Sequence, residues 1–294
     1  LFEMDEASGV PLEDVTEVSN HVAALAHGLE RLRGGFPLSN RLIREVHGVL
    51  MSGPGGKGKH PGEFRRSQNW IGGSRPGNAA YVPPPPALVP DCMSALERFL
   101  HQKDDGLSEL VRTGLAHVQF ETIHPFLDGN GRVGRLLVTL MLHDAGVLRE
   151  PILYLSLYLK ENRTRYYSLL DGVRGNGDWE AWLAFFLEGV HQTAEGAFAT
   201  VQRLRELFQA DHDRIAPTGR RAGSALRVHE ALKARPLASI GDLCERTGLS
   251  FPTAGSAIDL LGELGITREL TGKERNRIFA YDRYLAILSE GTEV

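Results

Sequence analysis

Residues 124–135 bring together side chains that could carry out chemistry on a nucleotide. An imidazole near its unperturbed pKa, such as that of His124, can take a proton from a hydroxyl group at neutral pH. The carboxylate of Asp128 can hold a Mg²⁺ ion that is shared with phosphate oxygens. The guanidinium groups of Arg132 and Arg135 can bind phosphate through two hydrogen bonds each. The segment therefore predicts a site for phosphate chemistry rather than a solvated turn.

Two helices joined by a glycine-rich turn must position these side chains. Residues 107–123 carry apolar side chains at helical spacings, and Pro125 disfavours the helical conformation at His124. The sequence Asp-Gly-Asn-Gly at 128–131 can turn tightly and direct successive backbone N–H groups inward, which makes an anion-binding nest. A second helix is predicted over 132–145, and the N–H groups at its beginning favour a phosphate.

The sequence of residues 124–135, HPFLDGNGRVGR, resembles the motif of the Fic family, H-P-F-x-D/E-G-N-G-R-x-x-R, and every motif position matches. The resemblance implies a mostly helical fold. It also implies an enzyme that transfers AMP from ATP to a Ser, Thr or Tyr hydroxyl of a protein, or of the enzyme itself, and releases pyrophosphate. Family relatives that transfer phosphate carry Lys at the position of Gly131, so that reaction is disfavoured.

The resemblance also implies a role for each motif residue. His124 would be the general base, and Phe126 would anchor the loop in the core. Asp128 would hold the Mg²⁺, with Mn²⁺ as the alternative ion, that bridges the α- and β-phosphates. The other phosphate-binding residues would be Gly129, Asn130 and Gly131 in the anion hole, Arg132, and Arg135 at the γ-phosphate.

A second match to the family lies upstream of the motif. Residues 65–73 and 78–82 flank a segment rich in Gly, Pro, Ser and Asn, and this pattern predicts a β-hairpin with a loop. In the Fic family a hairpin called the flap covers the active site and pairs with the target segment through its main chain, as in β-augmentation. The residues to which the resemblance assigns this role are Trp70, Ile71, Gly72 and Gly73. The alternative is a surface hairpin without a role in the reaction.

Two further sets of residues leave alternatives open. Tyr166 and Tyr167 lie in a helix predicted over 158–173; the resemblance places a tyrosine near the adenine or ribose, whereas aromatic pairs are also typical of a core. His117 and Glu121 share one helix face with the motif histidine, but a zinc site would require a third ligand and different companions. We therefore interpret His117 and Glu121 as supporting or structural residues.

Composition excludes several classes of protein. The net charge of −4 over 294 residues gives no general attraction to nucleic acid, and no G-x-x-x-x-G-K-S/T motif of a P-loop NTPase occurs. Cys92 and Cys244 lack metal-ligand spacing and are predicted to be reduced thiols. No apolar run reaches transmembrane length and no signal peptide is visible, so we expect a cytoplasmic protein that does not associate with membranes.

The pattern of elements predicts a mainly α fold with three segments. Residues 1–210 form the helical Fic catalytic domain, interrupted by the small β-hairpin flap. Residues 211–223 are polar, contain Pro and Gly, and predict a linker. Residues 224–294 carry three helical patterns followed by a hairpin pattern, which predicts a winged helix-turn-helix domain.

The charge pattern of this C-terminal domain does not favour DNA as a partner. Residues 250–265 contain no Lys or Arg, although a recognition helix normally brings basic or amide groups to base edges. Only the predicted wing, residues 273–277, is basic. We therefore favour a role in protein interaction or in formation of a homodimer.

The inhibitory motif of the family is missing from this sequence. Fic enzymes are usually silenced by a helix with the pattern S/T-x-x-x-E-G/N, whose Glu pairs with the second motif arginine, here Arg135. No Glu-Gly or Glu-Asn pair of the chain has Ser or Thr four residues before the Glu. We therefore expect a fragment that has lost this helix and is more active than its parent.

Two alternatives to AMP transfer remain. Removal of AMP from a modified protein uses the inhibitory Glu to align water, and this sequence offers no such Glu. A DNA-binding regulator with a vestigial Fic core is the non-enzymatic alternative, against which the intact motif argues.

Overall fold

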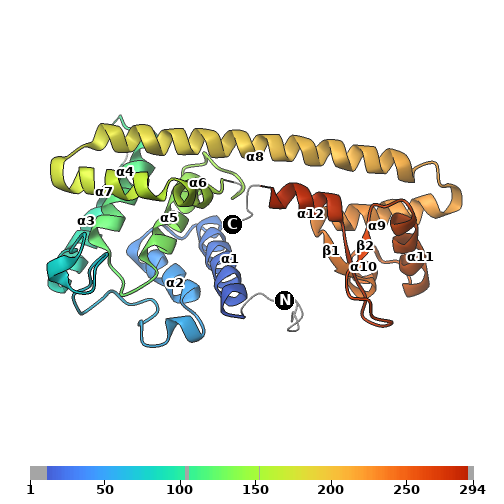
Figure 1. The fold of residues 1–294 in the computed structure, drawn as a ribbon, viewed down its shortest axis with the longest axis horizontal. Helices are drawn as coiled ribbons and strands as arrows, with labels where there is room; N and C mark the ends of the chain where they lie inside the picture. The colour runs from blue at the N-terminus through green and yellow to red at the C-terminus, as the bar shows by residue number, and fades with distance from the viewer. Residues whose placement is uncertain (1–11, 103–105, 152, 291–294) are drawn as a thin grey trace. The chain divides into compact units, whose positions relative to one another are not determined.

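The computed structural model describes residues 12–102, 106–151 and 153–290 (Figure 1). These residues are mainly helical, as predicted, and the chain forms two compact units, Leu1–Thr193 and Ala194–Val294. The helices that begin in the first unit are α1 (Leu12–Arg33), α2 (Asn40–Leu50), α3 (Val89–His101), α4 (Glu109–Ile123), α5 (Asn130–Asp144), α6 (Leu155–Glu161), α7 (Arg163–Asn176) and α8 (Trp179–Ile215).

Side-chain caps set the beginnings of α2 and α4. The Ser39 hydroxyl accepts a hydrogen bond from the Leu42 N–H at the beginning of α2. Ser108 does the same for Val111 at the beginning of α4. Such caps satisfy N–H groups that have no partner within the helix, so the short polar residue marks where the helix begins.

The single helix predicted over 158–173 is instead two helices, α6 and α7, which meet at Asn162. Both the backbone N–H and the side-chain amide of Asn162 donate to the Tyr158 carbonyl, at 3.0 Å each. Its backbone leaves the helical region, at φ −100° and ψ 29°. An Asn side chain that bonds to nearby backbone offers the chain an alternative to continuing a helix. The periodicity of the apolar residues did not reveal the break between α6 and α7.

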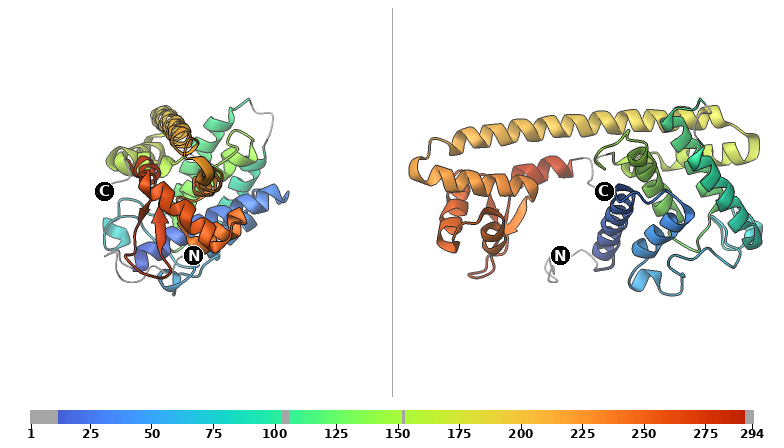
Figure 2. Two further views of the ribbon diagram at one scale, coloured as in Figure 1. Left: turned by 90° about the vertical axis from the view of Figure 1, so that its right-hand side faces the viewer. Right: turned by 180° about the vertical axis from the view of Figure 1, so that it is seen from behind.

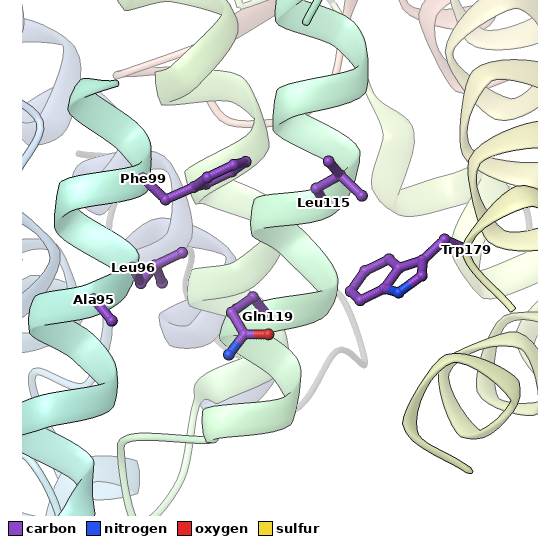
Figure 3. Close-up of a pocket in the computed structure, with 6 residues that line it drawn as sticks. All are labelled: Ala95, Leu96, Phe99, Leu115, Gln119 and Trp179. Atoms are coloured by element: carbon purple, nitrogen blue, oxygen red, sulfur yellow. The ribbon is translucent and has the colours of Figure 1, made fainter. Parts of the chain in front are cut away.

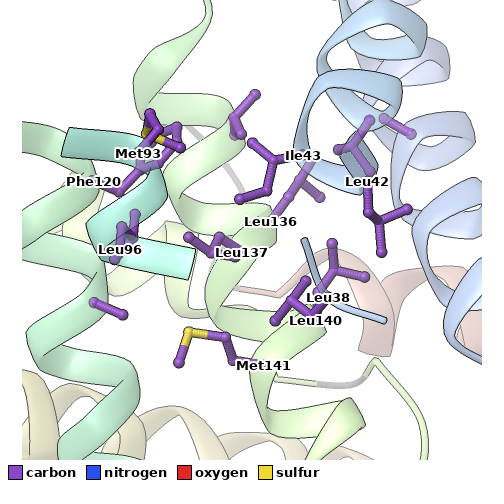
Figure 4. Close-up of a cluster of buried hydrophobic side chains, with 14 of the residues drawn as sticks. Leu38, Leu42, Ile43, Met93, Leu96, Phe120, Leu136, Leu137, Leu140 and Met141 are labelled. Carbon is purple, nitrogen blue, oxygen red and sulfur yellow. The ribbon is translucent and has the colours of Figure 1, made fainter. Parts of the chain in front are cut away.

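Helix α5 lies at the centre of the first unit, where it packs against α1, α2 and α4, and α4 packs in turn against α3 and α7. Figure 4 shows the apolar side chains that meet between these helices. Those labelled there are Leu38, Leu42, Ile43, Met93, Leu96, Phe120, Leu136, Leu137, Leu140 and Met141. This core fixes the end of α4 against the beginning of α5, and the motif loop joins these two ends.

Truncation of this core is expected to destabilise the unit strongly. Leu137→Ala should lower the free energy of unfolding by about 2–5 kcal/mol, because Leu137 is 1% exposed and its removal leaves a cavity. Denaturant unfolding monitored by circular dichroism measures the change. Leu88→Ala is the control, since Leu88 is 49% exposed and should change little. Equal effects of the two variants would contradict this assignment of the core.

The second unit contains the remainder of α8 and a small sheet with helices around it (Figure 2). Its further elements are α9 (Ala222–Ala234), β1 (Leu237–Ser239), α10 (Ile240–Thr247), α11 (Phe251–Glu263), β2 (Arg268–Glu269), β3 (Ile278–Ala280) and α12 (Asp282–Ser289). The strands are antiparallel in the order β1-β3-β2. The three predicted helices and the hairpin are present in the predicted order, and the winged-helix assignment stays a prediction.

The segment predicted as a linker, 211–223, is partly helical. Helix α8 continues to Ile215, because Asp211 and Ile215 are fully buried in the second unit. The Asp211 carboxylate accepts hydrogen bonds from the Tyr281 hydroxyl at 2.7 Å and from Arg214 at 2.9 Å. The compact units divide earlier, after Thr193 and within α8.

Among the described residues, none of the helices combines the length and apolar character that crossing a bilayer requires.

Candidate active site

His124 follows α4 directly and has the left-handed backbone conformation, with φ 51° and ψ 60°. Residues other than Gly adopt this conformation rarely. Helix α4 ends at Ile123, as Pro125 predicted. The His124 N–H donates to the Phe120 carbonyl at 2.9 Å, so the turn is closed by a helical hydrogen bond while the side chain is turned out of the helical path.

Side chains from distant segments hold this helix end, residues 121–124, through its carbonyl oxygens. Arg174 of α7 donates to the Glu121 carbonyl at 3.1 Å. The Tyr81 hydroxyl donates to the next carbonyl at 3.0 Å, and Arg65 donates to the two that follow, at 3.4 and 2.9 Å. The last carbonyls of a helix have no partner within it. At the end of α4 the distant side chains pair with these carbonyls, and they hold the backbone of His124 in place.

Arg65 also joins the base of the predicted flap to this helix end. It is 3% exposed, and its guanidinium donates to the carbonyls of Ser67, Pro84, Ile123 and His124. Its backbone N–H donates to the carbonyl of residue 125 at 2.8 Å. Sequence patterns did not single out Arg65 or Tyr81, because their partners lie about 20 to 60 residues away along the chain.

Arg65→Lys is expected to lower the free energy of unfolding by about 2 kcal/mol, because an ammonium group cannot reach all four carbonyls and leaves some of them unpaired. Thermal and denaturant unfolding measure the loss. Arg66→Lys is the matched control, since the neighbouring Arg66 is exposed. If the Arg65 variant unfolds like the Arg66 variant, these hydrogen bonds do not hold the helix end.

The predicted flap is reduced to one antiparallel bridge, between Ile71 and Tyr81, closed by a 3-10 turn at Pro76–Asn78. The bend needs glycine at Gly73, whose φ is 71° and where a Cβ would lie 2.3 Å from the carbonyl oxygen of residue 78. Gly72 also has positive φ, and Trp70 is 38% exposed. Few inter-strand hydrogen bonds form because the segment is short and rich in Gly and Pro.

The motif loop is locked by Asn130 and Phe126. The Asn130 side chain accepts the Phe126 N–H and donates to the Phe126 carbonyl, both at 2.8 Å, and Asn130 is 2% exposed. Asn69 of the flap segment donates to the same carbonyl at 2.9 Å. The Asn130 amide is therefore used inside the loop, and only the backbone of Asn130 is left to contribute to an anion hole.

His47 of α2 supports the same loop and was missed by the sequence analysis. Its ring stacks on Phe126 with centroids 3.7 Å apart. The Gly62 N–H donates to His47 Nδ1 at 2.8 Å, so Nε2 carries the proton and donates to the Asp128 carbonyl at 3.1 Å. Burial lowers the pKa of His47 to about 4, so the ring is neutral at pH 7. In the sequence His47 continues the buried face of α2, which resembles an ordinary core position.

The Asp128 carboxylate lies at the beginning of α5 and is half-exposed. It accepts the Gly129 N–H at 2.6 Å. Lys59 Nζ lies 3.7 Å and Arg132 Nη2 3.9 Å from its oxygens. Mg²⁺ in proteins is typically held by one or two carboxylates together with substrate phosphates and water. A single accessible carboxylate beside two cations that can bind phosphate fits such an ion.

Arg132 also faces α1, which the sequence analysis did not connect with the site. Its guanidinium lies 3.3 Å from the Glu17 carboxylate. The two side chains line a pocket of about 220 Å³, together with residues that include Asn20 and Met51. His21 lies near the motif arginines; burial lowers its pKa and the positive charges of Arg135 and Arg132 lower it further.

Burial also controls the charge of His124, whose side chain is 18% exposed. Its pKa is lowered to about 4, mainly by burial and also by Arg174 and Arg65, against the opposite effects of the Glu121 backbone and of Asp128. The imidazole is therefore neutral at pH 7 and carries a free lone pair, as a general base must.

The tyrosine pair is divided between core and surface. Tyr166 is buried, and its hydroxyl donates to His117 Nε2 at 2.9 Å, since His117 Nδ1 donates to the Gly134 carbonyl at 3.1 Å. This network supports the core interpretation for Tyr166 and a structural role for His117. Tyr167 is 43% exposed, and the Arg163 guanidinium lies over its ring.

An apolar pocket of about 540 Å³ in the first unit has no motif residue in its lining. Figure 3 shows the side chains that line it. It is lined by Ala95, Leu96, Phe99, Leu115, Gln119 and Trp179. These side chains include no carboxylate, imidazole, ammonium or guanidinium group, so the pocket offers neither a general base nor a cation for phosphate. No group of three or more His, Cys, Asp or Glu able to hold a metal occurs among the described residues.

Comparisons with known proteins place this geometry in context. Residues 37–142 match the family model Fic/DOC family. The chain is similar to the protein adenylyltransferases Fic of Aedes aegypti and Drosophila melanogaster, at 35% and 33% identity over 135 residues in each case. The match covers 46% of this chain and 24% and 25% of those proteins, so the chain spans about a quarter of their length.

Two solved structures share the fold. A Fic family protein from Desulfovibrio desulfuricans G20 has a TM-score of 0.54 and 22% identity, over 92% of this chain and 75% of that one. A Fic domain containing signaling protein from Bacteroides thetaiotaomicron has a TM-score of 0.51 and 21% identity, over 63% of this chain and 72% of that one.

Proposed function

We propose that this protein, whose residues 37–142 match the Fic/DOC family model, transfers AMP from ATP to a hydroxyl side chain of a protein, either a partner or the chain itself. The target oxygen forms a bond to the α-phosphorus, the bond from that phosphorus to the bridging oxygen breaks, and pyrophosphate leaves. The hydroxyl proton goes to His124.

The observation that carries the proposal is the placement of His124. Its backbone N–H and carbonyl are held by hydrogen bonds in the loop between α4 and α5, and its imidazole is neutral. Asp128 lies in the same loop, and the motif arginines lie in the first turns of α5. A phosphate at the beginning of α5 is favoured by the helix dipole and by unpaired N–H groups. Much of the rate of such a reaction comes from positioning the reactants.

Each remaining motif residue has a proposed task. Arg132 binds the phosphates and Arg135 the γ-phosphate, and the backbone of residues 129–131 surrounds the α- and β-phosphates. Asp128 would hold Mg²⁺, which when bound offsets phosphate charge and orients the leaving group. The flap segment, residues 70–73, presents main chain to the target. These tasks require that Glu17 releases Arg132 when ATP binds.

We further propose that the second unit recognises protein, in a target or in a second copy, rather than DNA. Helix α11 contains no Lys or Arg and has Phe251 63% exposed near its beginning. Light scattering and titration with duplex DNA distinguish these partners, and tight DNA binding would favour the regulator alternative.

Incubation with labelled ATP and Mg²⁺, followed by mass spectrometry of the enzyme and of a cell lysate, tests the reaction directly. A mass increase that corresponds to AMP on a Ser, Thr or Tyr side chain is expected. Labelling from γ-labelled ATP only would indicate phosphate transfer. No modification with either label would count against the proposed function.

A further inference from the structure

Glu121 is a buried carboxylate beneath the motif loop. It lies on α4, one turn before His124, and is 5% exposed. Its Oε1 is inaccessible and has no hydrogen-bond partner among the residues that the structure describes. The first turns of α5 cover it, since a Cβ at Gly134 would lie 2.2 Å from this oxygen. A buried carboxylate oxygen without a hydrogen-bond partner is costly, so this arrangement requires an explanation.

The ring of His124 lies close enough to interact with the negative charge of this carboxylate. Glu121 Oε2 lies 3.9 Å from His124 Nδ1. His124 Nδ1 is also buried and has no hydrogen-bond partner among the described residues. The second oxygen of the buried carboxylate therefore lies near a buried ring nitrogen that has no hydrogen-bond partner among the described residues, at a distance longer than a hydrogen bond. Catalytic hydrogen bonds in ligand-free enzymes are often long and shorten when substrates bind.

We propose that Glu121 is a positioning residue for His124, and this inference rests on the proposed AMP transfer. In its ionised form the carboxylate accepts the Nδ1 proton of His124, which leaves the Nε2 lone pair free for the target hydroxyl. The carboxylate also stabilises the imidazolium that forms when the proton is transferred, as a buried Asp does in the Ser-His-Asp triad.

The protonation state of Glu121 decides which nitrogen of the imidazole is free. A neutral imidazole has one N–H, and an ionised carboxylate can only accept a hydrogen bond. A protonated carboxyl group can instead donate to Nδ1, which moves the ring proton to Nε2 and blocks the base. The carboxylate thus favours the active tautomer, and the carboxylic acid favours the inactive one.

Several charged or titratable groups face Glu121. Arg135 comes from α5, Arg174 and Tyr166 come from α7, and His117 lies one turn earlier on α4. Burial raises the pKa of Glu121 to about 7, against the opposite effect of the two arginines. Tyr166 and His117 are neutral at this pH, since burial raises the pKa of the former and lowers that of the latter to about 4.

The rate of transfer by the wild-type protein should therefore rise as the pH increases through about 7, because Glu121 loses its proton in this range. His124 does not produce this change, since its own pKa lies near 4. The variant Glu121→Gln removes the titrating group and keeps the shape of the side chain. We expect its turnover at pH 8 to fall at least about tenfold, with KM for ATP nearly unchanged and without the rise near pH 7.

Glu109→Gln is the matched control. Glu109 lies in the first turn of α4, and its side chain is 49% exposed, so the same chemical change occurs on the same helix far from His124. This variant should keep both the turnover and the pH profile of the wild type. Thermal unfolding should show that Glu121→Gln is as stable as the wild type or more stable, because a poorly paired buried charge has been removed.

Nitrogen NMR of the His124 ring, assigned with His124→Asn, provides a readout that does not depend on activity. Above pH 7 the wild type should show the proton on Nδ1, and Glu121→Gln should shift the tautomer population. The inference is overturned if the Gln variant keeps the wild-type pH profile and tautomer, or if it loses turnover only together with stability. If the wild type transfers no AMP, the proposed function fails. The tautomer of His124 measured by NMR still tests the interaction between Glu121 and His124.

Discussion

Replacement of His124 should reduce AMP transfer about 10²- to 10⁴-fold, which is the usual contribution of a general base. ATP binding should change little, because the phosphates are assigned to the other motif residues. His124→Asn is more informative than His124→Ala, since Asn tolerates the left-handed backbone that His124 adopts, at φ 51°. Single-turnover transfer of labelled AMP measures the rate, and calorimetry with ATP measures binding.

His143→Ala is the control for the loss of an imidazole. His143 lies in the last turn of α5, and its Nδ1 contacts the Leu148 carbonyl at 3.0 Å, so it has no proposed contact with ATP. It should transfer AMP at nearly the wild-type rate. Wild-type turnover by either His124 variant would remove this residue from the mechanism, whereas a loss of ATP binding would indicate a structural role.

Asp128→Ala should weaken Mg²⁺-dependent ATP binding by about tenfold or more, since even partners of metal ligands contribute 10- to 100-fold. The physical reason is that this carboxylate is the only acidic side chain in the motif. Its oxygens lie beside Arg132 and Lys59, to which the proposed function brings the phosphates. Calorimetry with ATP in Mg²⁺ and in EDTA measures the metal-dependent part of the affinity.

Asp144→Ala is the matched control, because Asp144 is an exposed acid in the last position of the same helix. Its affinity for Mg²⁺–ATP should equal that of the wild type. Removal of Mg²⁺ should lower the ATP affinity of the wild type to that of Asp128→Ala. It should leave the ATP affinity of Asp128→Ala unchanged. An Asp128 variant with undiminished metal dependence would require another ligand for the ion.

The local features of the site could be predicted from the order of the residues alone. Residues 124–135 are contiguous, so their chemical types and spacing could be evaluated without a structure. The end of α4 follows from Pro125, and α10 is bounded by Ser239 and Gly248, residue types that typically cap helices. Caps, turns and helical periodicity act over a few residues, and this is why they can be predicted from the sequence.

The distant residues that support the motif could be identified only in the folded chain. His47, Arg65 and Arg174 contact the loop and the end of α4 from other segments, and their positions in the sequence look like ordinary core or surface positions. Tyr166 could be assigned to the core only once its burial and its bond to His117 were seen.

Local structure that depends on packing could not be predicted from the sequence either. Strand β1 (Leu237–Ser239) has three residues, too few for a periodic pattern, and it forms because β3, about 40 residues later, pairs with it. The facing of Glu121 and His124 depends on burial by α5 as well as on their spacing. Burial and long-range pairing are properties of the folded chain, so their effects on pKa values could not be predicted from the sequence.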